Sequence, residues 1–323
     1  MPTASGPLLL GLDLGGTKLS AVVGTPAGEV LHRQVTATLA TDGRAAVIDR
    51  IVALLGSVLS HASERPVALG VSHGGPVDPT TGLCRSVNLP EWEDVPLGTI
   101  LSDALGLPVE IDNDANAGAL AEFMFGAGVG HRSIAYMTMG TGIGGGIVHE
   151  GRIFRGAYGM AGEIGHVTIV RDGRPCNCGR RGCLQAYASG PAIAAAGLDA
   201  AVANDDSELL GLRDSAGALS CEALCAAARR GNAVALGVIH EAAVCMGIGC
   251  ASFIKVVDPE LIAIGTLAVK AGDLLLETIN EVAYGEYHGL MPDRRPIVAS
   301  GLGDDVGDMA ALALAAQGAR PAG

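Results

Sequence analysis

Residues 8–24 read LLLGLDLGGTKLSAVVG, in which apolar and small residues stand on both sides of a Gly-Gly pair. This pattern is typical of a β-hairpin. The turn contains five candidate phosphate-binding residues: Asp13, Gly15, Gly16, Thr17 and Lys18. Glycine permits positive φ and leaves backbone N–H groups open, and a nest of such groups binds an anion. The stretch therefore predicts a phosphate-binding hairpin, with an ordinary hairpin turn as the alternative.

The same turn does not form a P-loop, although Gly11 and Gly16 have the separation of that motif. Thr17 stands where a P-loop requires lysine, so the motif fails. Asp13 instead adds a carboxylate that could act on a magnesium ion.

A second glycine loop repeats this plan. The segment SIAYMTMGTGIGGGIVHEGRIF again reads as strand, glycine turn and strand. Gly140, Gly142 and Gly145 formally match the dinucleotide fingerprint, but that motif must open a helix, and a strand-like run follows here. We therefore expect a second phosphate hairpin that includes Gly140, Thr141 and Gly142.

The rest of the chain alternates strands and helices. Strands are expected at 29–38, 66–73, 108–112, 261–265 and 296–300, and helices at 43–62, 97–105, 191–204, 219–231, 233–254, 270–283 and after Gly303. The pattern in each half of the chain thus predicts one α/β domain, and we expect a cleft between the two domains. We expect the boundary near residues 115–130. A smaller domain would hold 1–118 with a C-terminal helix of about 304–323, and a larger one 119–303.

Composition excludes several classes of protein. Hydrophobic residues make up 49% of the 323 residues, so a sizeable core can be buried. A net charge of −13 argues against nucleic acid as a partner. The N-terminus lacks the basic region of a signal peptide, and the most apolar stretch, Ala242–Ile254, is too short to cross a bilayer. We therefore expect a soluble cytoplasmic protein without a membrane partner, whose cysteines are thiols or metal ligands.

Asn113 and Asp114 lie where a predicted strand passes into a predicted helix. Such a junction places a side chain at the carboxyl end of a strand, where ligands of α/β proteins bind. Asp114 could act there as a general base on a hydroxyl. Helix capping alone explains an Asp or Asn at this position equally well.

The segment GHVTIVRDGRPCNCGRRGCLQAYASG, residues 165–190, contains one histidine and three of the eight cysteines of the chain. His166, Cys176, Cys178 and Cys183 suit tetrahedral zinc, and a Cys₃His set is a closed, structural combination. The neighbouring arginines could offset the negative charge of three thiolates. The alternative is three thiols near an unrelated histidine.

Taken together, these motifs resemble the ROK family of bacterial sugar kinases and sugar-responsive repressors. This family lies within the actin-like and hexokinase-like ATPase superfamily, whose fold is ribonuclease H-like. The resemblance covers nearly the whole chain and rests on LDLGGTK, IDNDAN, MGTGIGGGI, GEIGH and the CxCGxxGCL loop. It implies two domains, each with a mixed sheet flanked by helices, and an active site in the cleft between them.

The resemblance also implies roles for individual residues. Asp114 would be the catalytic base on a sugar 6-hydroxyl that attacks ATP. A further set would contact the sugar: Asn113, Glu163, His166, Gln185 and Gly75. The two hairpins and Gly265 would bind ATP with Mg²⁺. A structural Zn²⁺ would hold one ring nitrogen of His166, leaving the other for the sugar.

Three departures from the family pattern bear on the substrate. Gln185 stands where a glutamate is usual, Gly74 and Gly75 replace Pro-Gly, and Thr266 and Leu267 stand where an adenosine-side glycine run is common. The resemblance implies a glucokinase-like hexose kinase that forms a homo-oligomer. Its alternatives are a kinase for an amino sugar (N-acetylmannosamine, N-acetylglucosamine or an amino-glucose) and a weakly catalytic sugar sensor. Because the first hairpin begins by residue 8, we expect no repressor-type DNA-binding domain before it.

Overall fold

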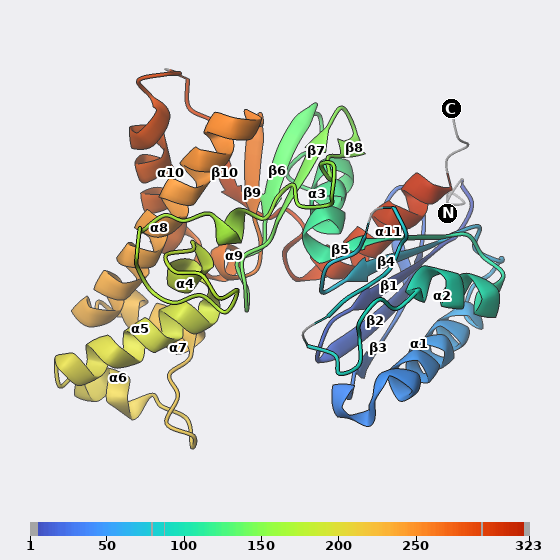
Figure 1. Ribbon diagram of the computed structural model, residues 1–323, viewed down its shortest axis with the longest axis horizontal. Coiled ribbons are helices and arrows are strands. Elements are labelled where there is room, and N and C mark those ends of the chain that lie inside the picture. The colour runs from blue at the N-terminus through green and yellow to red at the C-terminus, as the bar shows by residue number, and fades with distance from the viewer. Residues whose placement is uncertain (1–5, 79, 87, 292, 320–323) are drawn as a thin grey trace. The chain divides into compact units, whose positions relative to one another are not determined.

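The computed structural model describes residues 6–78, 80–86, 88–291 and 293–319. It contains two compact units, one formed by Met1–Gly130, Gly146–Ala161 and Asp304–Gly323 and the other by His131–Gly145 and Gly162–Gly303. Figure 1 shows their elements. The first segment of this unit ends at Gly130, at the far end of the expected boundary range of 115–130. Helix α3 (Asp114–Phe125) belongs to this unit because it packs on helix α11 (Val306–Gly318). The predicted domains, and an active site between them, stay predictions.

A mixed five-stranded sheet forms the centre of the first unit, in the order β3-β2-β1-β4-β5. The strands are β1 (Leu9–Leu14), β2 (Lys18–Gly24), β3 (Val30–Ala37), β4 (Leu69–His73) and β5 (Val109–Asn113). Strands β1 to β3 are antiparallel neighbours, whereas β4 and β5 run parallel to β1. The hairpin predicted at 8–24 is therefore confirmed, and three parallel strands end at one edge of this sheet.

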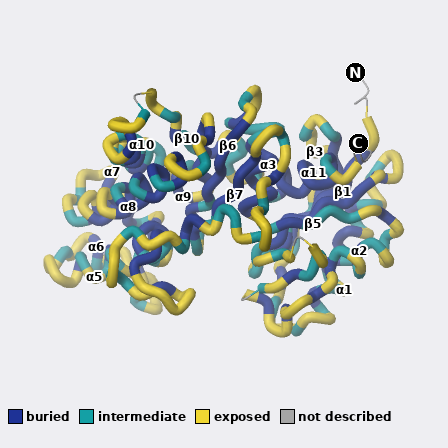
Figure 2. The backbone as a smooth tube through the Cα atoms, turned by 45° about the horizontal axis from the view of Figure 1, so that its top comes forward, coloured by how far each residue is buried: buried dark blue, intermediate teal, exposed yellow. Residues whose placement is uncertain are grey.

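The helices of the first unit cover the two faces of this sheet. Helices α1 (Arg44–Leu59) and α2 (Leu97–Leu105) share one apolar core with the side chains of β1 and β4. Helix α11 packs on the other face, where Gly11 and Gly70 let its backbone approach the strands. Figure 2 shows β1 as buried chain. A short 3₁₀ turn, Ala40–Asp42, precedes α1.

The second sheet has the order β10-β9-β6-β7-β8. Its strands are β6 (Ser133–Met137), β7 (Gly145–His149), β8 (Arg152–Ile153), β9 (Leu261–Ile264) and β10 (Ile297–Ala299), with β9 parallel to both β6 and β10. Most of β7 and all of β8 belong to residues 146–161, which group with the first unit. Both sheets thus join a three-strand meander to two later parallel strands, which explains the repeated glycine-turn pattern.

About half of the second unit is helical. Its helices are α4 (Gln185–Ala188), α5 (Gly190–Ala203), α6 (Ser207–Gly211), α7 (Cys221–Arg229), α8 (Ala233–Val257), α9 (Leu267–Ala271) and α10 (Asp273–Tyr287), with a 3₁₀ turn at Ile164–His166. A second 3₁₀ turn, Gly303–Asp305, lies where the chain passes back into the first unit. The single helix expected at 270–283 is two helices, because the chain breaks at Gly272 with φ of 58°. Helix α6 was not predicted from the sequence.

Helix α8 is longer than the apolar stretch, Ala242–Ile254, that was judged too short to cross a bilayer. It has 25 residues, so it is long and apolar enough to cross a bilayer, unlike the shorter stretch counted in the sequence. However, 56% of its most apolar window is buried, and it packs against α10, α7 and α5. Burial, rather than length, identifies α8 as a core helix.

The contact between β4 and α11 can be tested by filling the space at Gly70. A Cβ there would overlap the Ala311 carbonyl oxygen and the Ala315 nitrogen of α11. We expect Gly70→Ala to lower the free energy of unfolding by at least about 1–3 kcal/mol, because helix and sheet must move apart. Chemical denaturation measures this loss. Gly56→Ala in α1, where a Cβ meets nothing within 4 Å, is the matched control and should be neutral or stabilising.

Candidate functional site

The first glycine hairpin is a tight turn at the carboxyl end of β1. The Gly15 N–H donates to the Lys18 carbonyl at 3.0 Å, and the Thr38 hydroxyl donates to the Gly15 carbonyl at 2.7 Å. Neither Gly15 nor Gly16 has positive φ, so this one of the two reasons for glycine at the turn is wrong. Glycine is needed at position 16 for space, since a Cβ there would lie 2.8 Å from that of Asn88.

Asp13 is held beneath this turn, next to the start of α11. A Cβ on Gly307 would collide with its carboxylate, so the first turn of α11 lies directly against Asp13. Burial raises the pKa of Asp13 to about 6, with Lys18 lowering it and Asp308 raising it. Asp308 is itself paired with Arg33, at 2.8 Å between Nε and Oδ2. Asp13 is therefore a carboxylate whose ionisation a cation would favour, as a magnesium ligand requires.

Residues Asp112 to Asp114 end β5 and begin α3. Asn113 is the N-cap of α3, and its Oδ1 accepts from the Asn116 N–H at 2.7 Å. Asp112 is buried and accepts from Arg155 Nε at 2.6 Å and from Asn116 Nδ2 at 2.9 Å. The capping alternative thus holds for Asn113, whereas Asp114 is the exposed first residue of the helix. Capping by Asn113 and the buried Asp112–Arg155 pair fix the backbone that carries Asp114.

The neighbouring strand, β4, ends at His73 and continues into Gly74 and Gly75. His73 is fully buried, and its Nε2 lies 2.9 Å from the Arg85 carbonyl oxygen. Its Nδ1 has no hydrogen-bond partner in the described part of the chain, and burial lowers the pKa of the ring. A Cβ on Gly75 would overlap the same carbonyl. The neutral ring of His73 therefore packs against Gly75 and binds the carbonyl that Gly75 approaches.

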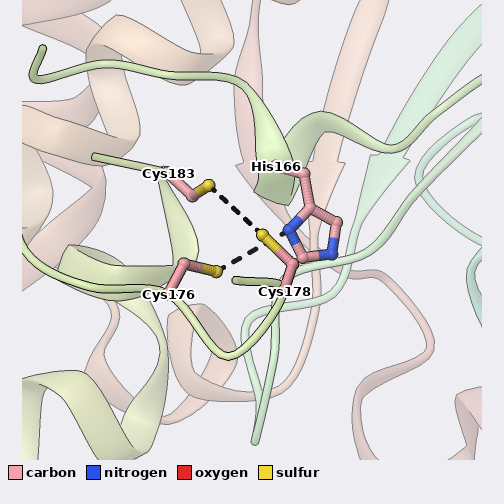
Figure 3. A group of neighbouring side chains, drawn as sticks. All are labelled: His166, Cys176, Cys178 and Cys183. Carbon is pink, nitrogen blue, oxygen red and sulfur yellow. Dashed lines mark hydrogen bonds between the residues drawn. The ribbon is translucent and has the colours of Figure 1, made fainter. Parts of the chain in front are cut away.

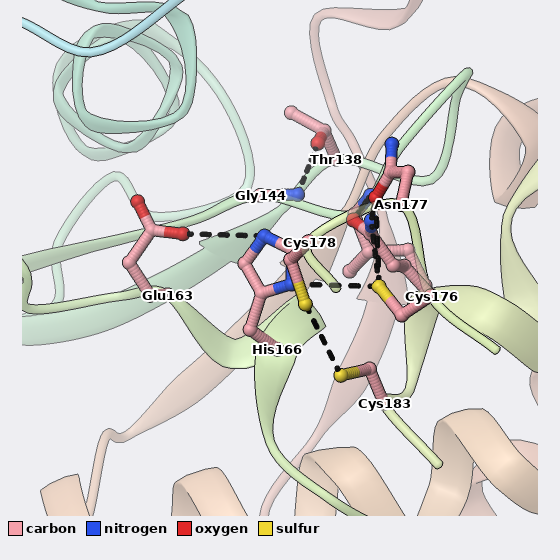
Figure 4. A network of polar contacts seen from close by, with 10 residues as sticks. Thr138, Gly144, Glu163, His166, Cys176, Asn177, Cys178 and Cys183 are labelled. Carbon is pink, nitrogen blue, oxygen red and sulfur yellow. Dashed lines mark hydrogen bonds and ion pairs between the residues drawn. The ribbon is translucent and has the colours of Figure 1, made fainter. Parts of the chain in front are cut away.

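The second glycine hairpin connects β6 to β7. The Thr138 N–H donates to the Gly144 carbonyl at 3.0 Å, and the Gly144 N–H donates to Thr138 Oγ1 at 2.8 Å (Figure 4). Within the loop, the Gly140 N–H donates to the Gly142 carbonyl at 3.0 Å. The turn is therefore closed by its own backbone, as expected of a hairpin rather than of a dinucleotide fingerprint.

A cavity of about 340 Å³ in the second unit adjoins this hairpin. The hairpin contributes Met139, Gly140 and Thr141 to its lining. The remaining lining residues come from α5, α7, the β9–α9 turn and α9: Gly190, Pro191, Ala194, Cys221, Glu222, Thr266, Leu267 and Lys270. Thr266 has φ of 54°, which is unusual for a β-branched residue. Sequence reasoning missed Glu222 and Lys270 and treated Cys221 as a core residue, because only the fold brings α7 and α9 to this hairpin.

The cysteines and histidine of residues 165–190 form a single cluster, drawn in Figure 3. The ligand atoms of His166, Cys176, Cys178 and Cys183 all lie within 4.8 Å of one another. The Cys178 and Cys183 sulfurs are 3.7 Å apart, and Cys176 Sγ is 3.8 Å from His166 Nδ1. The sulfur–sulfur distance is far longer than a disulfide bond of about 2.05 Å. It matches the roughly 3.7 Å edge of a tetrahedron with Zn–S bonds of about 2.3 Å. The donor set therefore fits zinc.

The loop that carries the cluster is fixed by backbone contacts. Gly182 has φ of 77°, and a Cβ there would overlap the Val170 carbonyl. Arg174 anchors the other side, because its N–H donates to the Tyr187 hydroxyl at 2.7 Å and its guanidinium pairs with Glu241 at 3.0 Å. The cluster is thus held by the protein chain itself. Burial raises the pKa of Cys183 to about 12, and a hydrogen bond from the Arg180 backbone lowers that of Cys178.

Two polar side chains flank the cluster. Glu163 Oε2 lies 3.9 Å from His166 Nε2, the ring nitrogen that points away from Cys176 (Figure 4). This distance allows an ion pair with a protonated ring but is too long for a hydrogen bond. Gln185 contacts the cluster at Cys176, with Nε2 3.4 Å from Cys176 Sγ and 2.6 Å from Asn177 Oδ1.

Comparison with known proteins identifies the family. The model of the ROK family matches residues 9–318. The chain belongs to the ROK family. It is 38% identical over 277 residues to a glucokinase from Halalkalibacterium halodurans, covering 84% of each chain. It is 31% identical to a putative xylose repressor from Caldicellulosiruptor sp., covering 86% of this chain and 70% of the repressor.

A solved structure extends this relationship to the fold. The ROK family glucokinase from Streptomyces griseus, in complex with glucose and AMPPNP, matches this chain with a TM-score of 0.83 and 33% identity. The match covers 96% of this chain and 99% of that one. The predicted family and the two-domain, actin-like α/β fold are therefore confirmed, and this ROK protein is glucokinase-like.

The raised pKa of Asp13 predicts how stability depends on pH. In the folded protein Asp13 holds its proton up to about pH 6, above its ordinary value of 3.8, so its contribution to stability is lost as the pH rises through this window. We expect Asp13→Asn to melt at a higher temperature than the parent above pH 6 and at the same temperature near pH 4. Thermal melts from pH 4 to 8 measure this. The exposed Asp49→Asn serves as control, and a constant difference at all pH values would contradict the prediction.

Proposed function

We propose that this ROK protein transfers the γ-phosphoryl group of ATP to the 6-hydroxyl of a hexose. The observation that carries the proposal is the position of Asp114. It is exposed at the first residue of α3, on a backbone fixed by the Asn113 cap, and it follows β5. Strand β5 runs parallel to β4, and β4 to β1, so Asp114 lies at the sheet edge where β1 ends in the first glycine hairpin.

Asp114 acts as the general base in this reaction. Its carboxylate accepts the proton of the sugar 6-hydroxyl as that oxygen attacks the γ-phosphorus and the bond to the leaving β-phosphate oxygen breaks. Asn113 orients neighbouring sugar hydroxyls through its side-chain amide, and the Gly74–Gly75 turn forms part of the same wall.

The two glycine hairpins bind the phosphates of the donor. Gly15, Gly16 and Thr17 supply backbone N–H groups in the first hairpin, with Lys18 as a nearby cation. Asp13 would hold the Mg²⁺ that accompanies ATP. Gly140, Thr141 and Gly142 do the same in the second hairpin. The cavity beside that hairpin is large enough for a nucleoside. Gly265 is the first residue of the β9–α9 turn, whose next residue, Thr266, lines the cavity.

Zinc has a structural role in this proposal. His166, Cys176, Cys178 and Cys183 would hold the ion, and a closed set of four protein ligands would leave no position for an activated water. Ligation through Nδ1 would fix the ring of His166 and leave Nε2, with Glu163, available to the sugar. Gln185 differs from the other proposed sugar contacts, because both ends of its amide already have partners in the protein.

Two alternatives have support. Gln185 and the Gly74–Gly75 turn differ from the usual family residues, which favours an amino-sugar kinase. The similarity to a xylose repressor favours a sugar sensor. We propose the kinase because Asp114 and both hairpins are intact. We further propose a cytoplasmic homo-oligomer that binds neither nucleic acid nor membrane. ADP release over a panel of hexoses and amino-hexoses tests these readings, and no turnover despite sugar-induced thermal stabilisation would favour the sensor.

The base assignment predicts the effect of one substitution. Asp114→Asn removes the proton acceptor but keeps its size, so kcat should fall by about 10²–10⁴-fold while sugar binding largely survives. Steady-state kinetics and calorimetry with the sugar measure the two quantities. Asp103→Asn, an exposed carboxylate on α2, is the matched control. Near-normal kcat in Asp114→Asn would refute the assignment.

The metal assignment predicts one zinc ion per chain. Cys183→Ser should lose this ion, and both this variant and the chelated parent should melt at lower temperature, because metal binding stabilises the folded loop. Elemental analysis and thermal melts measure these effects. Cys245→Ala, a buried thiol in α8, should keep the zinc. Active enzyme without zinc would overturn the assignment.

A further inference from the structure

Thr266, in the β9–α9 turn, has a backbone conformation that is unfavourable for its residue type. Its φ is 54° and its ψ is −101°, outside the left-handed helical region that other L-residues sometimes adopt. Among the described non-glycine residues with positive φ, Thr266 is the one with a β-branched side chain. A conformation of this kind persists only where surrounding contacts fix it, and such outliers concentrate at functional sites.

Hydrogen bonds on both sides of Thr266 hold it in this conformation. The Gly265 N–H donates to the Met137 carbonyl at 2.9 Å, and the Leu267 N–H donates to the Met139 carbonyl at 3.1 Å. Both acceptors belong to the chain that enters the second glycine hairpin from β6. The turn is thus tied to the hairpin just before and just after the strained residue. Rotation of Thr266 toward an ordinary φ would break at least one of these bonds.

The side chain of Thr266 lies against the loop of the same hairpin. Its methyl carbon is 3.7 Å, and its hydroxyl oxygen 3.9 Å, from the position that a Cβ on Gly140 would take. Thr266 and Gly140 both line the cavity of about 340 Å³. The side chain therefore stands where the glycine loop meets the cavity.

Contacts within the protein do not offset the strain at Thr266. The residue is exposed, whereas the following Leu267 is buried. Its hydroxyl has no hydrogen-bond partner in the part of the chain that the structure describes. Neither burial of the methyl group nor an internal bond of the hydroxyl therefore accounts for a threonine here. A hydroxyl that is fixed at a cavity without a protein partner is available to a ligand.

We propose that Thr266 is a donor-binding residue, whose hydroxyl binds a phosphate oxygen of the phosphoryl donor where the phosphates pass Gly140. A hydroxyl can donate to such an oxygen, and the strained turn holds it in place before the donor arrives. Binding then orders little further, which favours affinity. The proposal rests on the proposed binding of donor phosphates at the second glycine hairpin, and it does not depend on the sugar.

Three substitutions separate the hydroxyl from the strain in the full-length protein. Thr266→Val keeps the branched shape and loses the hydroxyl, Thr266→Ser keeps the hydroxyl, and Thr266→Gly removes both the side chain and the strain. Asp205→Gly is the control, because Asp205 is exposed, has φ of 47° and is not part of the cavity lining.

Two probes and one stability measurement are needed. Calorimetry with AMPPNP in excess Mg²⁺, without sugar, measures donor affinity. Competition by inorganic tripolyphosphate against AMPPNP measures the affinity for phosphates alone. Thermal melts without ligand measure stability and verify that each variant is folded.

We expect Thr266→Val to bind both probes about 3–10-fold more weakly than the parent, the loss typical of one hydrogen bond, and to melt at the parental temperature. Thr266→Ser should bind both probes with parental affinity. Thr266→Gly should bind both more weakly and yet melt about 2–4 °C higher, because the strain is relieved. Asp205→Gly should bind both probes as the parent does.

The contrary outcomes distinguish this role from the proposed kinase activity. Parental affinity for AMPPNP in Thr266→Val would overturn the contact with the hydroxyl, and a loss for AMPPNP alone would overturn the contact with phosphate. Melting of Thr266→Gly at or below the parental temperature would overturn the strained turn as the means of holding the hydroxyl. A parent that binds AMPPNP but phosphorylates no sugar refutes the kinase alone, and its variants still test this role. A parent that binds no AMPPNP, or in which tripolyphosphate does not compete with it, refutes the phosphate site at the hairpin and this role with it.

Discussion

Backbone-to-backbone contact is the constraint on which the fold and the candidate site depend. Helix α11 reaches the first sheet because Gly70 has no side chain, and that approach places Gly307 against the carboxylate of Asp13. In the second unit, Gly165 lets its chain pass the carbonyl of Ile143, and Gly182 does the same at Val170. A methyl group at any of these positions would push apart two segments that carry candidate site residues. This explains part of the unusual glycine content better than flexibility does.

Close packing removes water from polar side chains, and this desolvation is unfavourable where a buried charge has no partner. Asp13 is desolvated beside α11, so its negative charge is unfavourable until a cation is nearby. Asp112 is also buried, but Arg155 and Asn116 satisfy it, and it therefore serves as a fixed support for α3. The two carboxylates come from neighbouring parts of one sheet and differ in role because their surroundings differ.

Sequence reasoning predicted most elements and the four members of the Cys/His cluster. The hairpin at 8–24, the strand-to-helix junction at Asp114 and the Cys₃His set were all readable, because each depends on residues close together in the chain. Of the two reasons given for the glycines at the first turn, positive φ was wrong, whereas the need for space without a Cβ agrees with the close approach of Asn88 to Gly16. The sequence did not predict that Cys221 and Glu222 of α7 line the cavity, because α7 and the second glycine hairpin are distant in the chain.

The sequence by itself determined the family, the strand plan and the chemical types of the candidate ligands, since local patterns of apolar residues, glycine and cysteine decide these. Tertiary structure decided which partner each polar side chain has. Gln185 shows the difference: in the sequence it is a neutral residue after a cysteine motif. In the fold it lies within hydrogen-bond distance of Cys176 and Asn177 on one side and Ile143 on the other. A residue's type fixes what it can donate or accept, but only packing between distant segments decides to whom.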